Sequence, residues 1–401
     1  MKDLNLFKIF ALNLLIIALF DSYTVYSEFI FLKVVIYILK MLNLVTVLYL
    51  LRENTVVNYK WFIAVLPILY IYLSKDPILS VQLFYSAFLP VCCFLLLPDL
   101  YKKEVAHYYI KVFTILCLIG IPIYILVNLG LLPSLFSFTK GGDKLYFNYF
   151  LVYWGREGLL YRFTSIFDEP GVIGTLVPII CFYFNNELKI WQKIVLNIAG
   201  ILSLSMFYFI TIVPVLFFSD LRAISMKKTI KRVLLFVACI IGFYLALNII
   251  ALWTKDNPVL ALAVYHRFEW SGSWIIGVVN NRDTAIAGFD ELFDQWNNFK
   301  TVAYYIGYGK DYMLEVFEGS TLSYRTVLIE KGVLIIIYLF LYFAFFHQSK
   351  YKIYNLISMV FLMMIFFQRP TLYSINYFLL VFTGLYLYDE KEDSIRKSEI
   401  V

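Results

Sequence analysis

Apolar stretches long enough, or nearly long enough, to cross a lipid bilayer recur along almost the whole chain. A helix needs about 20 apolar residues to span a hydrocarbon core of ~30 Å. Stretches of this kind occur near 4–20, 29–51, 57–73, 77–97, 109–132, 163–184, 230–253, 327–346, 353–368 and 371–388. We therefore expect an all-α polytopic membrane protein, with residues 1–401 forming a single integral membrane domain.

The composition excludes several other classes of protein. Hydrophobic residues make up 62% of the chain and charged residues only 15%, whereas about 25% of a soluble domain is charged. A net charge of +6 spread over such a chain does not indicate a nucleic-acid binder. The five cysteines lie in apolar stretches without CxxC spacing, and the three histidines are far apart. Metal sites need clustered ligands, so we expect no metal and no cofactor.

The stretch 190–219 is either one long helix or two short helices broken at 202–205. The segment 185–193 at its start carries Lys189 and Lys193, and five Lys and Arg residues lie within 219–232 at its end. The positive-inside rule places both flanks in the cytoplasm, so an even number of crossings must lie between them. We therefore expect a hairpin of two short helices, which brings the total to about twelve transmembrane helices with both termini inside.

The distribution of Lys and Arg agrees with this threading. Cytoplasmic segments then hold 19 of the 34 Lys and Arg residues, outer loops hold 11 although they are longer, and four lie in or at helices. Two periplasmic loops are expected, at 133–162 and 254–320. The second is long and acidic, with five Lys and Arg against nine Asp and Glu. Its part 283–305 has apolar residues near helical spacing, which predicts short surface helices on the membrane face.

The most informative segment runs from Tyr161 to Gly171 and contains three ionisable residues, Arg162, Asp168 and Glu169. Pro170 suits the first turn of a helix, because its missing N–H would be unpaired there in any case. Small residues then share one side of that helix and predict close approach of a neighbour; they are Gly171, Gly174 and Thr175.

These ionisable residues have two interpretations. Groups at such membrane depth normally face a water-filled cavity and mark a functional site. Alternatively, Arg162 and Glu169 pair with each other and anchor the helix at the membrane interface. Glu169 is a poorer helix cap than Asp or Ser, which weakens a purely structural explanation.

A second group of candidates lies in the long periplasmic loop. It contains His266-Arg267, the triplet 281–283 with Arg282 at its centre, and Gly307-Tyr308-Gly309-Lys310. The planar arginine fork suits phosphate oxygens. The Gly-Tyr-Gly turn would cradle a phosphate through its amides, although it lacks the Walker spacing. His266 has the chemistry of an acid or base near neutral pH. The alternative is an ordinary solvated surface loop.

The pattern R-x-x-x-x-F-x-E-P-G at 162–171 resembles the bacterial O-antigen and capsule repeat-unit polymerases (Wzy type) and, more loosely, the O-antigen ligases. The order of later features is also similar. A short-helix hairpin and a basic turn come first, followed by Asn-Arg-Asp at 281–283 and Gly-Tyr-Gly at 307–309. A helix then opens at 320–323 and runs to 330–332. The resemblance covers about 160–345.

The resemblance implies a metal-independent glycosyltransferase of the bacterial inner membrane with its active site facing the periplasm. Its partners would be undecaprenyl-diphosphate-linked oligosaccharide, membrane lipid and a chain-length regulator. The catalytic residues would be Arg162 and Arg282, which stabilise the departing diphosphate, and Glu169, which acts as the base. Further candidate substrate-binding residues are Arg267, His266, Asp168, Arg156, Tyr324 and Arg325.

Two alternative functions remain open at this stage. Ligases of this kind have a histidine around positions 320–321, where this chain has Ser320 and Thr321, so ligation to lipid A core is disfavoured. A transporter or flippase of lipid-linked oligosaccharides would be expected to show repeated halves and charges near the bilayer midplane. Here the halves differ, and the candidate charges gather on one outer face.

Overall fold

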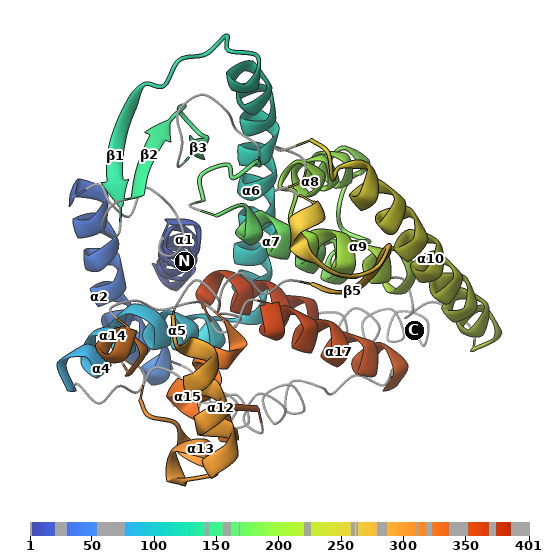
Figure 1. Cartoon of the computed structure of the whole chain (residues 1–401). Coiled ribbons are helices and arrows are strands. Elements are labelled where there is room, and N and C mark those ends of the chain that lie inside the picture. Colours follow the sequence, from blue (N-terminus) through green and yellow to red (C-terminus); the bar gives the residue numbers. More distant parts are fainter. Residues whose placement is uncertain are drawn as a thin grey trace.

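The structure, a computed structural model, is mostly helical (Figure 1). The described residues are 2–20, 30–53, 77–140, 144–154, 162–167, 169–219, 226–257, 261, 264–278, 287–309, 312–317, 323–336, 352–368 and 374–385.

The N-terminal part contains five α-helices and one π-helical segment. Their bounds are α1 Lys2–Phe20, α2 Ile30–Glu53, α4 Pro77–Leu83, the π-helix Phe84–Phe88, α5 Leu89–Leu96 and α6 Asp99–Asn128. Pro90 lies in the first turn of α5. Because proline has no N–H to continue the helical hydrogen bonding, it accounts for the widened turn that precedes α5.

The predicted division of 190–219 into two short helices is confirmed. Helix α7 (Pro170–Tyr183) is followed by α8 (Ile190–Leu202) and α9 (Met206–Phe218), and three residues separate these last two helices. Helix α10 (Met226–Trp253) comes next. Near the C-terminus lie α17 (Lys352–Gln368) and an apolar helix over Ile375–Leu385.

Two small antiparallel sheets correct the all-α prediction. The first consists of β1 Phe136–Lys140, β2 Lys144–Asn148 and β3 Tyr153–Trp154, and the second of β4 Phe268–Ser271 and β5 Trp274–Val278. Both fall in the expected periplasmic loops. Aromatic and β-branched residues favour strands there, as in the stacked cross-strand pair Phe138–Tyr146 with ring centroids 5.9 Å apart.

The long loop also carries the short helices predicted for 283–305. They are α12 Phe289–Phe299 and α13 Val302–Ile306, followed by α14 Tyr312–Phe317 and α15 Tyr324–Lys331. The side chains of Phe289 and Trp296 on α12 are buried inside the protein. These two aromatic residues therefore do not lie on a membrane surface. Helix α15 ends at Gly332, which interrupts the span predicted at 327–346.

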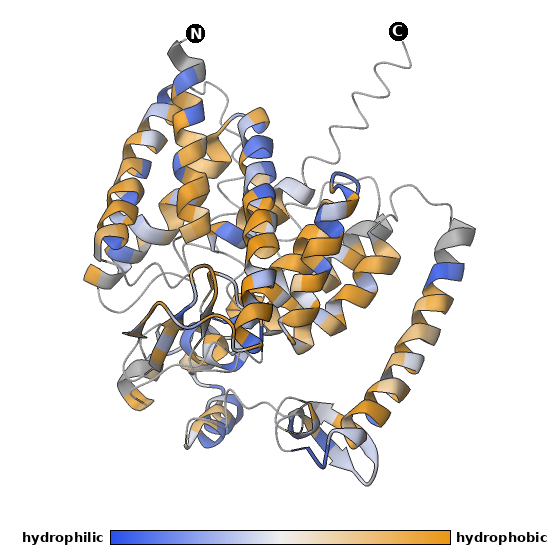
Figure 2. Ribbon diagram, turned by 90° about the horizontal axis from the view of Figure 1, so that it is seen from above, coloured by the Kyte–Doolittle hydropathy of each residue, from blue (hydrophilic) through white to orange (hydrophobic). Residues whose placement is uncertain are grey.

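Three described helices are long and apolar enough to cross a membrane, namely Phe31–Arg52, Asp99–Asn128 and Lys231–Trp253. Shorter apolar helices accompany them (Figure 2), and α2 and α10 carry many exposed large apolar side chains. These features indicate a multi-pass membrane protein. The total of about twelve spans stays a prediction, and the stretch 57–73 lies outside the described residues.

Candidate functional site

Arg162 precedes α7 in the chain and lies beside the C-terminal end of α8. Its Nε donates a hydrogen bond to the Ser203 carbonyl at 3.0 Å, and the Phe163 amide donates to the Leu202 carbonyl at 2.9 Å. The Arg162 side chain is half-buried. Since the guanidinium is planar and has five N–H donors, one bond through Nε orients the whole fork.

The segment 163–167, which connects Arg162 to α7, is buried although it is not helical. Phe163 packs against Tyr124 of α6, with ring centroids 5.7 Å apart, and Phe167 packs against Phe113 of α6 at 6.0 Å. A Cβ at Gly120 would come within 3.0 Å of the Phe163 ring, so α6 approaches closely there. Helix α6 therefore covers the irregular backbone of this segment.

The turn between α8 and α9 also contacts this segment. Leu204 has a φ of 45°, and the Ser205 amide donates to the Ser203 hydroxyl oxygen at 3.3 Å. A Cβ at Gly174 of α7 would meet Ser205 at only 2.3 Å. The predicted close approach of a neighbour on the small-residue side of α7 is therefore confirmed, and the neighbour is the 203–205 turn.

Glu169 is the N-cap residue of α7, and Pro170 occupies the first turn as predicted. The half-buried Glu169 side chain makes no capping hydrogen bond to α7. Arg162 before the segment and α7 after it therefore contact the same 203–205 turn. Arg162 contacts that turn through Ser203, and α7, whose N-cap position Glu169 occupies, contacts it through Gly174 and Ser205.

The phosphate cradle considered for Gly-Tyr-Gly is wrong. The Tyr308 amide donates to the Ile329 carbonyl and the Gly309 amide to the Glu330 carbonyl, both at 2.9 Å, and the Gly307 amide donates to Ala303 within its own helix. These amides thus satisfy the carbonyls at the end of α15. A Cβ at Gly307, where φ is 78°, would lie 2.2 Å from the Glu330 carbonyl oxygen, so this close backbone contact requires glycine.

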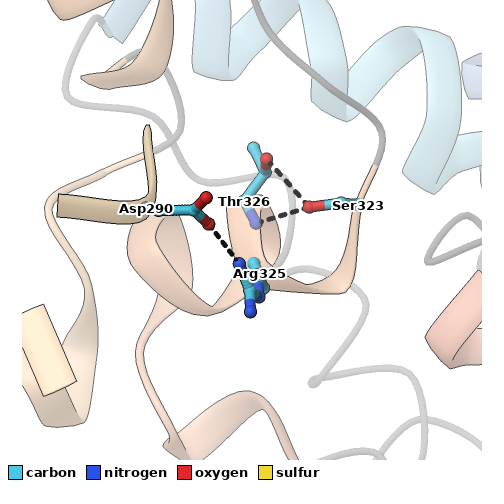
Figure 3. A network of polar contacts seen from close by, with 4 residues as sticks. All are labelled: Asp290, Ser323, Arg325 and Thr326. Carbon is cyan, nitrogen blue, oxygen red and sulfur yellow. Dashed lines mark hydrogen bonds and ion pairs between the residues drawn. The ribbon is translucent and has the colours of Figure 1, made fainter. Parts of the chain in front are cut away.

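Arg325 connects α15 to α12, as Figure 3 shows. Its Nη1 donates to Asp290 Oδ1 at 2.7 Å, and its guanidinium lies 4.7 Å from the centroid of the Phe293 ring. Ser323 caps the same helix by accepting from the Thr326 amide at 3.2 Å. The neighbouring Tyr324 ring packs edge-on against Phe367 of α17 at 5.1 Å. Arg325 and Tyr324 thus make structural contacts between helices.

The structure describes only some of the remaining candidate site residues. His266 is exposed in the 3-10 turn before β4, with its ring edge-on to Tyr265 at 5.5 Å. Arg267 ends that turn, but only its backbone belongs to the described structure. Three further candidates, Arg156, Asp168 and Arg282, lie outside the described residues. Within the part of the chain that is described, no three His, Cys, Asp or Glu residues gather as metal ligands.

The sequence contained a signal for Ser203 that the site predictions did not use. The Leu-Ser-Leu-Ser break at 202–205 indicated where α8 ends, and a helix end exposes carbonyls that need donors.

Comparisons with protein-family models, with curated proteins and with solved structures found no match for this chain. The resemblance at 162–171 therefore stays a sequence-based expectation.

Proposed function

We propose that this protein polymerises lipid-linked oligosaccharide repeat units at the outer face of the bacterial inner membrane. The growing glycan would pass from undecaprenyl diphosphate to the non-reducing end of another lipid-linked unit. The supporting observation is the placement of Arg162 and Glu169. Both are half-buried, at the two flanks of one covered irregular segment that packs against the 203–205 turn. The O-antigen ligase remains the alternative within the same chemistry.

In this reaction the bond between the donor sugar C1 and the diphosphate oxygen breaks, and a bond forms between C1 and the acceptor hydroxyl oxygen. The acceptor proton passes to the Glu169 carboxylate, and the electron pair leaves with the lipid diphosphate. A donor that is oriented before the reaction stabilises developing negative charge most effectively. The hydrogen bond from Arg162 Nε to Ser203 supplies such orientation. On the resemblance, Arg282 would supply a second cation.

The arrangement of the helices supports the proposed sidedness. In Figure 2 the first residues of α1 lie towards the edge opposite the hairpin β4–β5, to which the C-terminal end of α10 leads. This agrees with a cytoplasmic N-terminus and a periplasmic loop 254–320.

Labelling of single cysteines by a membrane-impermeant maleimide tests this topology. In intact spheroplasts, we expect His266→Cys to be labelled and Lys228→Cys to be labelled only after permeabilisation. His266 is exposed in the described structure, which makes it a suitable positive control. A variant in which the five native cysteines are replaced by Ala provides the background. Labelling of Lys228→Cys in intact spheroplasts would contradict the hairpin threading.

Deletion of the gene tests the reaction itself. We expect the strain to keep lipid A core capped with a single repeat unit and to lose the ladder of longer chains on a gel, because transfer of one unit does not require polymerisation. The wild-type gene on a plasmid should restore the ladder. Loss of the single-unit band as well would favour the ligase, and an unchanged ladder would rule out both activities.

A further inference from the structure

A cavity of about 880 Å³ lies between α9, α10, α17 and the hairpin β4–β5. Its described lining side chains are apolar except for Tyr244, whose hydroxyl donates a hydrogen bond to the Ile275 carbonyl at 2.7 Å. The proposed reaction at Arg162 does not use this space. Its walls therefore need a separate explanation.

The cavity exists because α10 is fastened to the rest of the protein near its two ends. At one end Phe236 packs against Phe218 with ring centroids 4.9 Å apart, and Arg232 Nη1 donates to the Phe217 carbonyl at 3.3 Å. At the other end the Ile275 amide donates to Asn248 Oδ1 at 2.7 Å. Only 6% of the apolar window of α10 is buried, so most of this helix is open to lipid (Figure 2).

A space of this kind does not stay empty in a membrane. Protein interiors are close-packed, and the walls of a void lose dispersion contacts. Water needs two to four polar partners, which these apolar walls do not provide. Because α10 borders the lipid, hydrocarbon chains can reach the cavity and fill it. The chemistry of the walls thus selects a lipid hydrocarbon chain.

The position of the cavity identifies which lipid it takes. Leu204 and Met206 line it. Leu204 directly follows Ser203, whose carbonyl accepts the hydrogen bond from Arg162, and Met206 is the first residue of α9. A diphosphate bound at Arg162 would therefore place the first carbons of its lipid tail beside Leu204. We propose that the cavity holds the polyprenyl chain of the lipid diphosphate, a proposal that rests on the proposed function for the position of the head group.

Tryptophan substitutions that fill the cavity test this proposal. Val213→Trp on α9 and Ile240→Trp on α10 add a ring to the lining. Leu216→Trp and Val237→Trp are matched controls on the same two helices, since both side chains are exposed and neither lines the cavity. The full chain would be purified into phosphatidylglycerol nanodiscs. Binding of radiolabelled undecaprenyl diphosphate, undecaprenol and inorganic diphosphate would then be measured.

We expect both filling variants to weaken binding of undecaprenyl diphosphate and of undecaprenol by at least about tenfold, since a few displaced CH₂ groups suffice for such a change. The controls should bind like the wild type, and binding of inorganic diphosphate should not change in any of the four. Thermal unfolding would check that the variants fold. Because the two filling positions lie on different helices, a folding defect in one leaves the other informative.

Equal affinity of filling and control variants for undecaprenyl diphosphate would overturn the proposal. So would loss of co-purified phospholipid from the filling variants without a change in undecaprenol binding, because the cavity would then belong to bulk lipid. Failure of the proposed function looks different. If Arg162→Ala leaves undecaprenyl diphosphate binding unchanged while undecaprenol binding still depends on Val213 and Ile240, the cavity proposal stands and the head-group site at Arg162 does not.

Discussion

Replacing Glu169 by glutamine is expected to reduce glycan polymerisation by about a hundredfold or more, the typical contribution of a positioned general base. The amide keeps the size and hydrogen-bonding reach of the side chain but cannot accept the acceptor proton. Since the Glu169 side chain makes no capping bond to α7, the helix should form normally. Elongation by the purified enzyme on lipid-linked units would measure the rate, and a blot would measure protein abundance.

The matched control is Glu187→Gln, the same substitution in the turn that follows α7. Glu187 Oε2 pairs with His107 Nε2 at 2.7 Å, where both side chains are partly exposed, so we expect little change in rate or abundance. Glu169→Asp shortens the reach of the carboxylate and should be intermediate. A wild-type rate for Glu169→Gln would show that Glu169 is not the base, and His266 would be the next residue to test.

Replacing Arg162 by lysine is expected to slow polymerisation about a hundredfold, the usual cost of losing one preorganised donor to a developing anion. Lysine keeps the positive charge and can still donate to the Ser203 carbonyl at the end of α8. It cannot present two parallel N–H groups to a diphosphate. A structural role would therefore be largely retained by this variant, whereas a role in binding the diphosphate would not.

Arg232→Lys provides the control because Arg232 makes the same kind of contact without being a site candidate. Its Nη1 donates to the Phe217 carbonyl near the end of α9, as Arg162 donates to Ser203 near the end of α8. We expect Arg232→Lys to have a near-normal rate. If both variants lose abundance in parallel and keep their rate per molecule, Arg162 serves only to stabilise a helix end.

Features that depend on neighbouring residues in the chain could be predicted from the sequence. The apolar stretches indicated a helical membrane protein, and the Leu-Ser-Leu-Ser break with its flanking charges predicted α8 and α9 as separate helices. Pro170 at the start of α7 was predicted in the same way, whereas the end of α15 at Gly332 interrupts the span expected at 327–346. Helix length, capping and termination are decided within a few residues, so a single sequence contains the necessary information.

The contacts between distant segments were decided by the tertiary structure alone. The pairing of Arg325 with Asp290 could not be read from the sequence, and the amides of Tyr308 and Gly309 bind the end of α15 instead of phosphate. The two sheets in the loops and the cavity beside α10 also had no signal in the pattern of apolar stretches. The physical reason is that hydrogen-bond donors and acceptors must be paired wherever they are buried. Which partner each one finds depends on how the helices pack, and residues far apart in the sequence determine that packing.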